Sequence, residues 1–275
     1  MIQKRTILYN LKFELTFILA IVLSACQSST SSLELPSLFS DNMVLQRNAE
    51  VQVWGNSSSQ TKIVVKFPWG QFDTTSEQDG SWNLTVTTAD YDKAFTMEVC
   101  DDHSCITIQN IVLGEVWLAS GQSNMEMPLK GWPPTEPIED SSEEIVNADQ
   151  YPLRFFKTEL TVSHIPNTAV EGSWKVSNTI NAPEFSATAY FFAKNLYQEL
   201  NVPIGIINSS WGGTPVQSWA DQSALQTISA YTDALKSIAE MDKKLDEFKE
   251  WLDPLNKFPN TCLLYTSPSP RDATL

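Results

Sequence analysis

A serine and two glycines stand directly after two apolar segments of the chain. Ser123 follows the apolar run 111–119, and Gly212 and Gly213 follow a second run, 204–208. A serine hydroxyl attacks a carbonyl carbon only when it has a general base, a group that orients this base, and N–H donors for the oxyanion. Glycine amides approach such an oxygen closely because no Cβ intervenes. The pattern fits nucleophilic catalysis by Ser123, and it equally fits two ordinary turns at strand ends.

The general base is the scarce component of such a mechanism. The 275 residues include two histidines, His103 and His164. His103 stands beside acidic residues in a predicted turn, where a solvated loop role is expected, and His164 lies in a stretch without a recognisable motif. Two histidines exclude a metal site built from several of them, and we predict no metal and no cofactor. Neither histidine is expected to serve Ser123 as its base.

Charge and composition exclude several classes of protein. The 33 Asp and Glu residues against 18 Lys and Arg residues give a net charge of −15. Nucleic-acid binding rests on neutralising phosphates with cationic side chains, so we predict no nucleic-acid partner. A hydrophobic fraction of 42% with 9 Trp and 13 Phe excludes a disordered chain. The length allows one large domain or two modest ones.

The first residues of the chain have the features of an export signal. Basic residues precede the apolar run 15–23, which is too short to cross a bilayer as a settled helix. Small residues and then Cys26 follow, in the manner of a bacterial lipobox whose cysteine becomes lipidated. We therefore predict a lipoprotein signal peptide over 1–25, lipidation of Cys26, and a serine-rich tether over 26–32. The predicted location is the bacterial cell envelope, with a lipid anchor in the membrane. An ordinary signal peptide with an incidental cysteine is the alternative.

Residues 33–111 have the pattern of a small all-β domain. Short alternating or β-branched segments are separated by turn residues, and no segment with helical periodicity interrupts them. Strands of this length and spacing predict an antiparallel β-sandwich. The expected strands are 51–54, 62–67, 82–87, 95–99 and 106–108.

Two pairs of side chains in this β domain allow more than one interpretation. Cys100 and Cys105 flank a predicted hairpin turn, so they form either a disulfide or two free thiols. Trp69 or Trp82 would offer a flat surface to a sugar, but core packing is the expected role of a tryptophan in a strand. We therefore assign no ligand to this domain from its sequence.

Beyond the β domain the pattern changes to alternating strands and helices. The run 111–119 has the character of a buried parallel strand, and 204–208 is the next short strand. Apolar residues with the spacing of one helical face follow Ser186. The segment that begins at Thr214 has a capping box and predicts a further helix. These elements predict a parallel sheet with helices, and they place Ser123 at the end of one strand.

Three blocks of sequence resemble the sialate O-acetylesterase family, a branch of the SGNH hydrolases. Residues 114–127, Gly-Glu-Val-Trp-Leu-Ala-Ser-Gly-Gln-Ser-Asn-Met-Glu-Met, are similar to the nucleophile block of that family. Residues 38–46 resemble the opening of the sandwich domain that precedes its catalytic domain, and 185–215 resemble its second block. The resemblance is collinear from about residue 33 to residue 219.

This resemblance implies a fold and a chemistry. The fold would be an antiparallel β-sandwich over 33–111, followed over 112–258 by an incomplete SGNH-type three-layer α/β/α domain with a parallel sheet. Ser123 would be the nucleophile, and the amides of Ser123 and of Gly212 or Gly213 would donate to the oxyanion. The substrate would be an O-acetylated sugar such as an O-acetylated sialic acid, and no metal would take part.

Two motifs of the family are missing from this sequence. One is a block close to Tyr-Gln-Gly-Glu-Ser-Asn, and the other is an Asp-x-x-His that supplies the base and its orienting acid. Residues 223–258 resemble the helical excursion that precedes the first of these motifs. Residues 259–275 match neither the family nor an amphipathic pattern, and we expect a foreign tail. The chain is therefore expected to be the N-terminal part of a longer family member, with impaired activity.

Three functions stay open on the sequence. The first is hydrolysis of O-acetyl esters of sialic acid or related sugars by Ser123. The second is another carbohydrate esterase of the same superfamily, such as an acetylxylan esterase, which would share the site and differ in pocket residues. The third is a non-catalytic glycan-binding lipoprotein that retains Ser123 without using it.

Overall fold

The computed structural model describes residues 33–89, 91–161, 169–237, 240, 243, 244 and 247. The described residues form two compact units. The first contains the residues up to Leu160 together with 169–212, and the second contains Thr161 and the residues from Gly213 onward. The predicted signal peptide with Cys26, the tether, His164 and the predicted tail lie outside the described residues.

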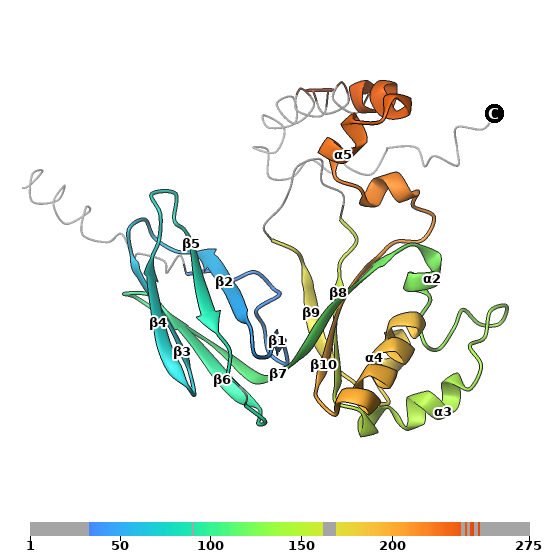
Figure 1. Cartoon of the computed structure of the whole chain (residues 1–275), viewed down its shortest axis with the longest axis horizontal. Helices are drawn as coiled ribbons and strands as arrows, with labels where there is room; N and C mark the ends of the chain where they lie inside the picture. The colour runs from blue at the N-terminus through green and yellow to red at the C-terminus, as the bar shows by residue number, and fades with distance from the viewer. Residues whose placement is uncertain are drawn as a thin grey trace, which may run out of the picture. The chain divides into compact units, whose positions relative to one another are not determined.

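One eight-stranded mixed sheet organises the first unit (Figure 1). Its strands follow the order β4-β3-β6-β7-β10-β8-β9, and β1 pairs with β7 outside this order. β2 and β5 form a separate two-stranded antiparallel sheet. The strands are β1 (Val44–Gln46), β2 (Glu50–Asn56), β3 (Lys62–Phe67), β4 (Gly70–Thr75), β5 (Ser81–Thr87), β6 (Phe95–Cys100), β7 (Cys105–Gly121), β8 (Leu153–Thr158), β9 (Gly172–Val176) and β10 (Ile204–Ser210).

β7 joins the antiparallel part of this sheet to the parallel part. Its first half pairs antiparallel with β6, and its second half pairs in parallel with β10. β10 pairs in parallel with β8, and the antiparallel β9 closes this edge of the sheet. The predicted parallel arrangement of 111–119 and 204–208 is confirmed. β7 also runs across the predicted domain boundary between residues 111 and 112, so both parts of the sheet share one strand.

Apolar side chains fill two cores, one on each face of the parallel part. Phe155 and Phe156 are neighbours in β8, and both are buried, each in a different core. The core around Phe156 also contains Val53 and Val86 of the two-stranded sheet and Ile63 of the large sheet. Residues of both sheets therefore contribute to one common core.

α4 (Ala187–Leu200) packs against the other core. Its N-cap is Ser186, as the sequence predicts, and the Ser186 hydroxyl accepts a hydrogen bond from the N–H of Ala189. Ala189, Tyr190 and Ala193 are buried in the core that also holds Phe155. The remaining helices of this unit are α2 (Ser123–Glu126), α3 (Ser141–Val146) and the 3₁₀ helices η1 (Ala148–Gln150) and η2 (Ala182–Glu184). Among the helices that the structure describes, none combines the length and apolar character of a membrane span.

The second unit begins differently from the sequence prediction. An α-helix capped by Thr214 is expected, but the structure has the 3₁₀ helix η3 (Val216–Trp219) without a side-chain hydrogen bond at its N-cap. The Thr214 hydroxyl instead accepts a hydrogen bond of 2.8 Å from the indole N–H of Trp219. A helix therefore follows Thr214 as predicted, but it is a 3₁₀ helix and its N-cap is Pro215, so the predicted N-cap at Thr214 is wrong. The predicted helical excursion begins with α5 (Gln222–Gln226) and η4 (Ser229–Tyr231).

The side chain of Gln46 continues the pairing of β7 where β1 ends. Its Oε1 accepts a hydrogen bond from the N–H of Val116, and its Nε2 donates to Glu115, both at 2.9 Å. Arg47 Nε donates to the same carboxylate at 2.9 Å. The hydrogen bonds from Gln46 and Arg47 hold the pKa of the Glu115 carboxyl below its usual value. The block 38–46 thus has a structural role beside the central strand.

A buried arginine ties β8 to the same region. Arg154 is 8% exposed, and its guanidinium donates to the carbonyl oxygens of Met43 and Asn110. A further hydrogen bond of 3.2 Å reaches the side-chain oxygen of Asn110. Burial lowers the pKa of Arg154 to about 10, so the group stays charged at neutral pH. Arg154 therefore satisfies carbonyl groups at the junction of β1, β7 and β8.

We expect Arg154→Met to lower the free energy of unfolding by about 2–4 kcal/mol, because the carbonyls of Met43 and Asn110 lose a charged donor. Urea denaturation followed by tryptophan fluorescence measures this change. Lys62→Met is the control, since the Lys62 side chain is 58% exposed, and it should change the value by less than about 0.5 kcal/mol. Equal urea midpoints for Arg154→Met and the wild type would contradict the assigned role.

Candidate active site

Ser123 lies at the edge of the sheet where its parallel strands end. β7 ends at Gly121, whose φ of +143° suits glycine, and Ser123 is the first residue of α2. Gly121 is in register with Ser210, the last residue of β10. The N–H of Trp211 donates to the carbonyl of Gly121 at 2.9 Å, which holds the two strand ends together. The turns after β7 and β10 therefore meet at one edge.

Gly212 lies against the Ser123 hydroxyl and against a carboxylate that sequence analysis did not single out. A Cβ on Gly212 would lie 3.3 Å from Ser123 Oγ and 2.5 Å from Glu126 Oε2. The N–H of Gly212 donates to Glu126 Oε2 at 2.7 Å. A side chain at position 212 would therefore displace the Glu126 carboxylate from this contact. The structure brings together Ser123, Gly212 and Glu126.

Glu126 was detectable in principle from its position in the chain. It follows Ser123 by three residues, and side chains at this spacing lie on one face of a helical turn. The sequence predicts that α2 begins at the nucleophile, so Glu126 is the first acid on the same face. Its carboxylate accepts a hydrogen bond from the Gly212 N–H, which is one of the predicted oxyanion donors.

The Ser123 hydroxyl itself has a weak polar environment. Its side chain is partly exposed, and its hydrogen bond to Gln122 Oε1 is 3.5 Å long, at the limit for such a bond. The backbone N–H of Ser123 is the first of α2 and has no intrahelical acceptor, as at every helix start. Gly213, the other predicted donor, has a φ of +78° and belongs to the second unit.

His103 is far from Ser123 along the central strand. It lies in the turn between β6 and β7, before the first residue of β7, whereas Ser123 follows the last. β7 has 17 residues, and a strand of that length spans on the order of 50 Å. His103 is therefore not the base for Ser123, as the sequence predicts.

A cavity of about 550 Å³ adjoins this site through Glu126. Lys157 of β8 and Lys175 of β9 line it and form no ion pair with a described residue. Three carboxylates also line it, those of Glu126, Glu159 and Glu184, and the first and last of these are engaged with the Gly212 N–H and with Lys130. The cavity therefore combines two cations and three carboxylates with the stacked rings of Phe155 and Phe185, whose centroids are 4.1 Å apart.

Cys100 and Cys105 are joined by a disulfide, with Cα atoms 4.1 Å apart. With Glu98 they form the one close group of three metal-ligand residue types in the described part of the chain. Both sulfur atoms are committed to the disulfide, so this group does not offer thiolate ligands. The candidate active site lies at the other end of β7.

Sequence comparison with known proteins identifies the family to which this chain belongs. Residues 113–250 match the model of the family described as carbohydrate esterase, sialic acid-specific acetylesterase, and the chain belongs to this family. It is 28% identical to the human sialate O-acetylesterase over 236 residues, which cover 77% of this chain and 43% of the human protein. It is 32% identical to the rat sialate O-acetylesterase over 130 residues, which cover 44% of this chain and 23% of the rat protein.

A solved structure of another protein has a fold similar to that of this chain. The crystal structure of a carbohydrate acetylesterase from Xanthomonas citri is 34% identical in sequence, with a TM-score of 0.66. The alignment covers 70% of this chain and 44% of that chain. The chain thus spans less than half the length of the relatives that it matches.

We expect Gly212→Ala to lower the free energy of unfolding by about 0.5–1.5 kcal/mol, because its Cβ would push the Glu126 carboxylate away from the Gly212 N–H and break that hydrogen bond. Thermal or urea denaturation measures the loss. Gly70→Ala is the matched control, since the nearest atom to its added Cβ is 3.7 Å away on Phe72. If both variants unfold at the same urea concentration, the close contact at Gly212 is refuted.

Proposed function

We propose that the protein is a carboxyl-ester hydrolase that removes O-acetyl groups from sialic acid or related sugars, with Ser123 as nucleophile. The observation that carries the proposal is the cluster of Ser123 and Gly212 at the adjoining ends of two parallel strands, in a chain of a carbohydrate esterase family. A serine at such a turn has an accessible hydroxyl beside backbone N–H donors. For this reason the geometry favours acyl transfer over a purely structural turn.

The proposed reaction proceeds through an acetyl-serine. Ser123 Oγ attacks the acetyl carbonyl carbon as its proton passes to a base, and the tetrahedral intermediate then releases the sugar oxygen, which takes a proton. Water attacks the acetyl-serine and releases acetate by the same steps. The N–H groups of Ser123 and Gly212, both in the first unit, are the proposed oxyanion donors. Since Gly212 donates to Glu126 in the free protein, this carboxylate must turn away before Gly212 can bind an oxyanion.

We further propose that ester hydrolysis by this chain is slow. A general base beside the nucleophile contributes about 10²–10⁴-fold to such reactions. His103 lies at the far end of β7, and none of the described residues brings an imidazole to Ser123. Oxyanion stabilisation and substrate binding would then account for the remaining rate.

The cavity beside Glu126 supports an acidic sugar as the substrate. Sialic acid carries a carboxylate, and Lys157 and Lys175 are cations without an ion-pair partner among the described residues. Of the three carboxylates that also line the cavity, those of Glu126 and Glu184 have partners of their own, and that of Glu159 stands beside the two lysines. An acetylxylan, the substrate of the alternative esterase, carries no carboxylate on its backbone sugars. Acetate release from O-acetylated sialic acid, compared with acetylated xylan, therefore separates these two functions.

We also propose a more detailed description of the fold. The two sheets that share the core around Phe156 would form an antiparallel β-sandwich, and the parallel strands with α4 would form part of an SGNH-type three-layer domain. The common core and the parallel order β7-β10-β8 support this description.

We expect Ser123→Ala to reduce hydrolysis of p-nitrophenyl acetate to the uncatalysed rate, since no other group would form the acetyl intermediate. The wild-type chain should be slow but measurable. Ser142→Ala, which changes an exposed serine of α3, is the control and should retain the wild-type rate. A wild-type chain no faster than Ser123→Ala would favour the third function, a glycan-binding protein that does not use its serine.

We also propose that the protein is exported and held at the cell envelope by a lipid on Cys26. The basic start, the apolar run 15–23 and the small residues before Cys26 support this location. The lipid chains would supply the membrane affinity.

In a bacterial host, Cys26→Ser should abolish incorporation of labelled palmitate and move the protein out of the membrane fraction. Cys262→Ser is the matched control and should remain labelled, because it lies outside the lipobox. Labelling that persists in Cys26→Ser would show that the anchor is absent or elsewhere.

A further inference from the structure

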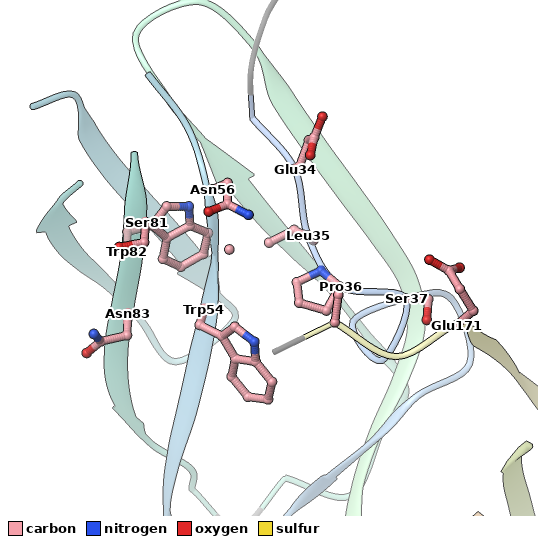
Figure 2. Close-up of a pocket in the computed structure, with 12 residues that line it drawn as sticks. Glu34, Leu35, Pro36, Ser37, Trp54, Asn56, Ser81, Trp82, Asn83 and Glu171 are labelled. Atoms are coloured by element: carbon pink, nitrogen blue, oxygen red, sulfur yellow. The ribbon is translucent and has the colours of Figure 1, made fainter. Parts of the chain in front are cut away.

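A second cavity lies in the β part of the chain, and none of its lining residues belongs to the Ser123 site. Its volume is about 510 Å³, which is within the range of small-molecule sites. Figure 2 shows its walls, with Trp54 and Trp82 on the neighbouring strands β2 and β5 and with Leu35 and Pro36 on the segment beside β2. Ser37 and Glu171 lie at one end of it in this view.

Named contacts hold these walls in place. Glu34 forms an antiparallel bridge with Asn56, with hydrogen bonds of 2.9 and 3.0 Å. The Ser37 hydroxyl donates to the carbonyl of Val170, which joins the segment before β1 to the segment before β9. The cavity is therefore bordered by backbone segments from distant parts of the sequence that hydrogen bonds hold together.

A glycine makes room for the close approach of these walls. A Cβ on Gly55 would lie 2.3 Å from the carbonyl oxygen of Glu34, 2.8 Å from Cζ2 of Trp82 and 3.1 Å from Cδ2 of Leu35. Gly55 and Trp82 are directly opposite each other in the pairing of β2 with β5. The missing side chain at position 55 thus allows the indole ring and the segment 34–35 to line the same space.

The chemistry of the lining suits a sugar. Trp54 is partly exposed and packs edge-on against Phe39, with ring centroids 4.7 Å apart, so its ring is held in one orientation. Indole faces bind the C–H faces of sugar rings through dispersion and hydrophobic contact. The side-chain amides of Asn56 and Asn83 form no hydrogen bond with a described residue. These amides both donate and accept, as hydroxyl groups require.

Trp82 adds apolar ring surface to the wall. Its side chain is 2% exposed, and its indole nitrogen lies beneath the protein surface without an acceptor in the described part of the chain. A ligand in the cavity would therefore contact ring carbon atoms of Trp82 and not its N–H group, so the polar contacts of the site come from Asn56, Asn83 and the carboxylates of the lining.

The charges of the lining restrict the class of sugar. Glu34 and Glu171 carry carboxylates, and the lining contains no Lys, Arg or His. Carboxylates accept hydrogen bonds from sugar hydroxyl groups, whereas they repel a carboxylate-bearing sugar. A cationic ligand would leave the side-chain N–H donors of Asn56 and Asn83 without acceptors.

We propose that the cavity between Trp54, Trp82 and the segment 34–37 is a binding site for a neutral sugar unit. It would hold a neutral part of the glycan, whereas the proposed ester substrate is an acidic sugar. This inference does not rest on the esterase proposal, because sugar binding here needs neither Ser123 nor an ester.

The test is titration of the full chain by calorimetry with four neutral disaccharides: lactose, cellobiose, xylobiose and N,N′-diacetylchitobiose. N-Acetylneuraminic acid and choline serve as the acidic and cationic comparisons. We expect one-to-one binding of at least one neutral disaccharide and weaker binding of both charged compounds. Trp54→Ala should weaken the binding at least tenfold, and Asn83→Ala and Glu171→Gln should weaken it severalfold. The exposed positions in Trp132→Ala and Glu139→Gln are matched controls and should leave it unchanged.

The two exposed polar variants decide the test if Trp54→Ala fails to fold, since neither removes a packed side chain. Absence of binding by all four disaccharides would overturn the proposal, and so would tighter binding of either charged compound. Binding that no lining variant weakens would also overturn it. Hydrolysis of p-nitrophenyl acetate is measured separately on the same variants, so failure of this site and failure of the esterase proposal are distinguishable.

Discussion

The structure depends on the pairing of one long strand with partners of opposite direction. β7 pairs antiparallel with β6 in its first half and in parallel with β10 in its second half. A Cβ on Gly114 would lie 2.1 Å from the carbonyl oxygen of Pro203, so the change of partner occurs where the two backbones touch. The β part and the α/β part are therefore consecutive portions of one sheet. The position of Ser123 follows from where this strand ends.

Much of this arrangement was predictable from sequence because the strands concerned have strong patterns. β3 and β7 carry alternating or continuous apolar residues, and α4 has both a helical face and a capping serine at Ser186. β4 was not predicted, since Phe72 is its single large apolar residue. β8 was missed for a different reason. Arg154 and Lys157 interrupt its apolar pattern, and Arg154 is buried because distant carbonyls accept its hydrogen bonds.

At the candidate site, too, features with a local sequence pattern were predictable, whereas contacts between distant residues were not. Ser123 and Gly212 were predictable, because each follows a recognisable strand and resembles a family block. The role of Glu126 was not, since its partner, the Gly212 N–H, is 86 residues away in the chain. Pairing of β7 with β10 brings Glu126 and Gly212 together, and the periodicity of neither segment predicts that contact. The N-cap predicted at Thr214 is Pro215 in the structure, and the Thr214 hydroxyl accepts a hydrogen bond from the nearby Trp219 indole.

The disulfide between Cys100 and Cys105 has a consequence well beyond its own turn. It joins residues that are directly opposite each other in the pairing of β6 with β7. A slip of one residue in that pairing would turn every side chain of a strand to the opposite face. The pairing shifts between Met97, opposite Ile108, and Phe95, opposite Ile111, so the covalent link fixes the register of the part of β7 that precedes this irregularity. The bond thus acts as a register lock for the antiparallel start of β7, and the pairing with β1 and β10 sets the rest.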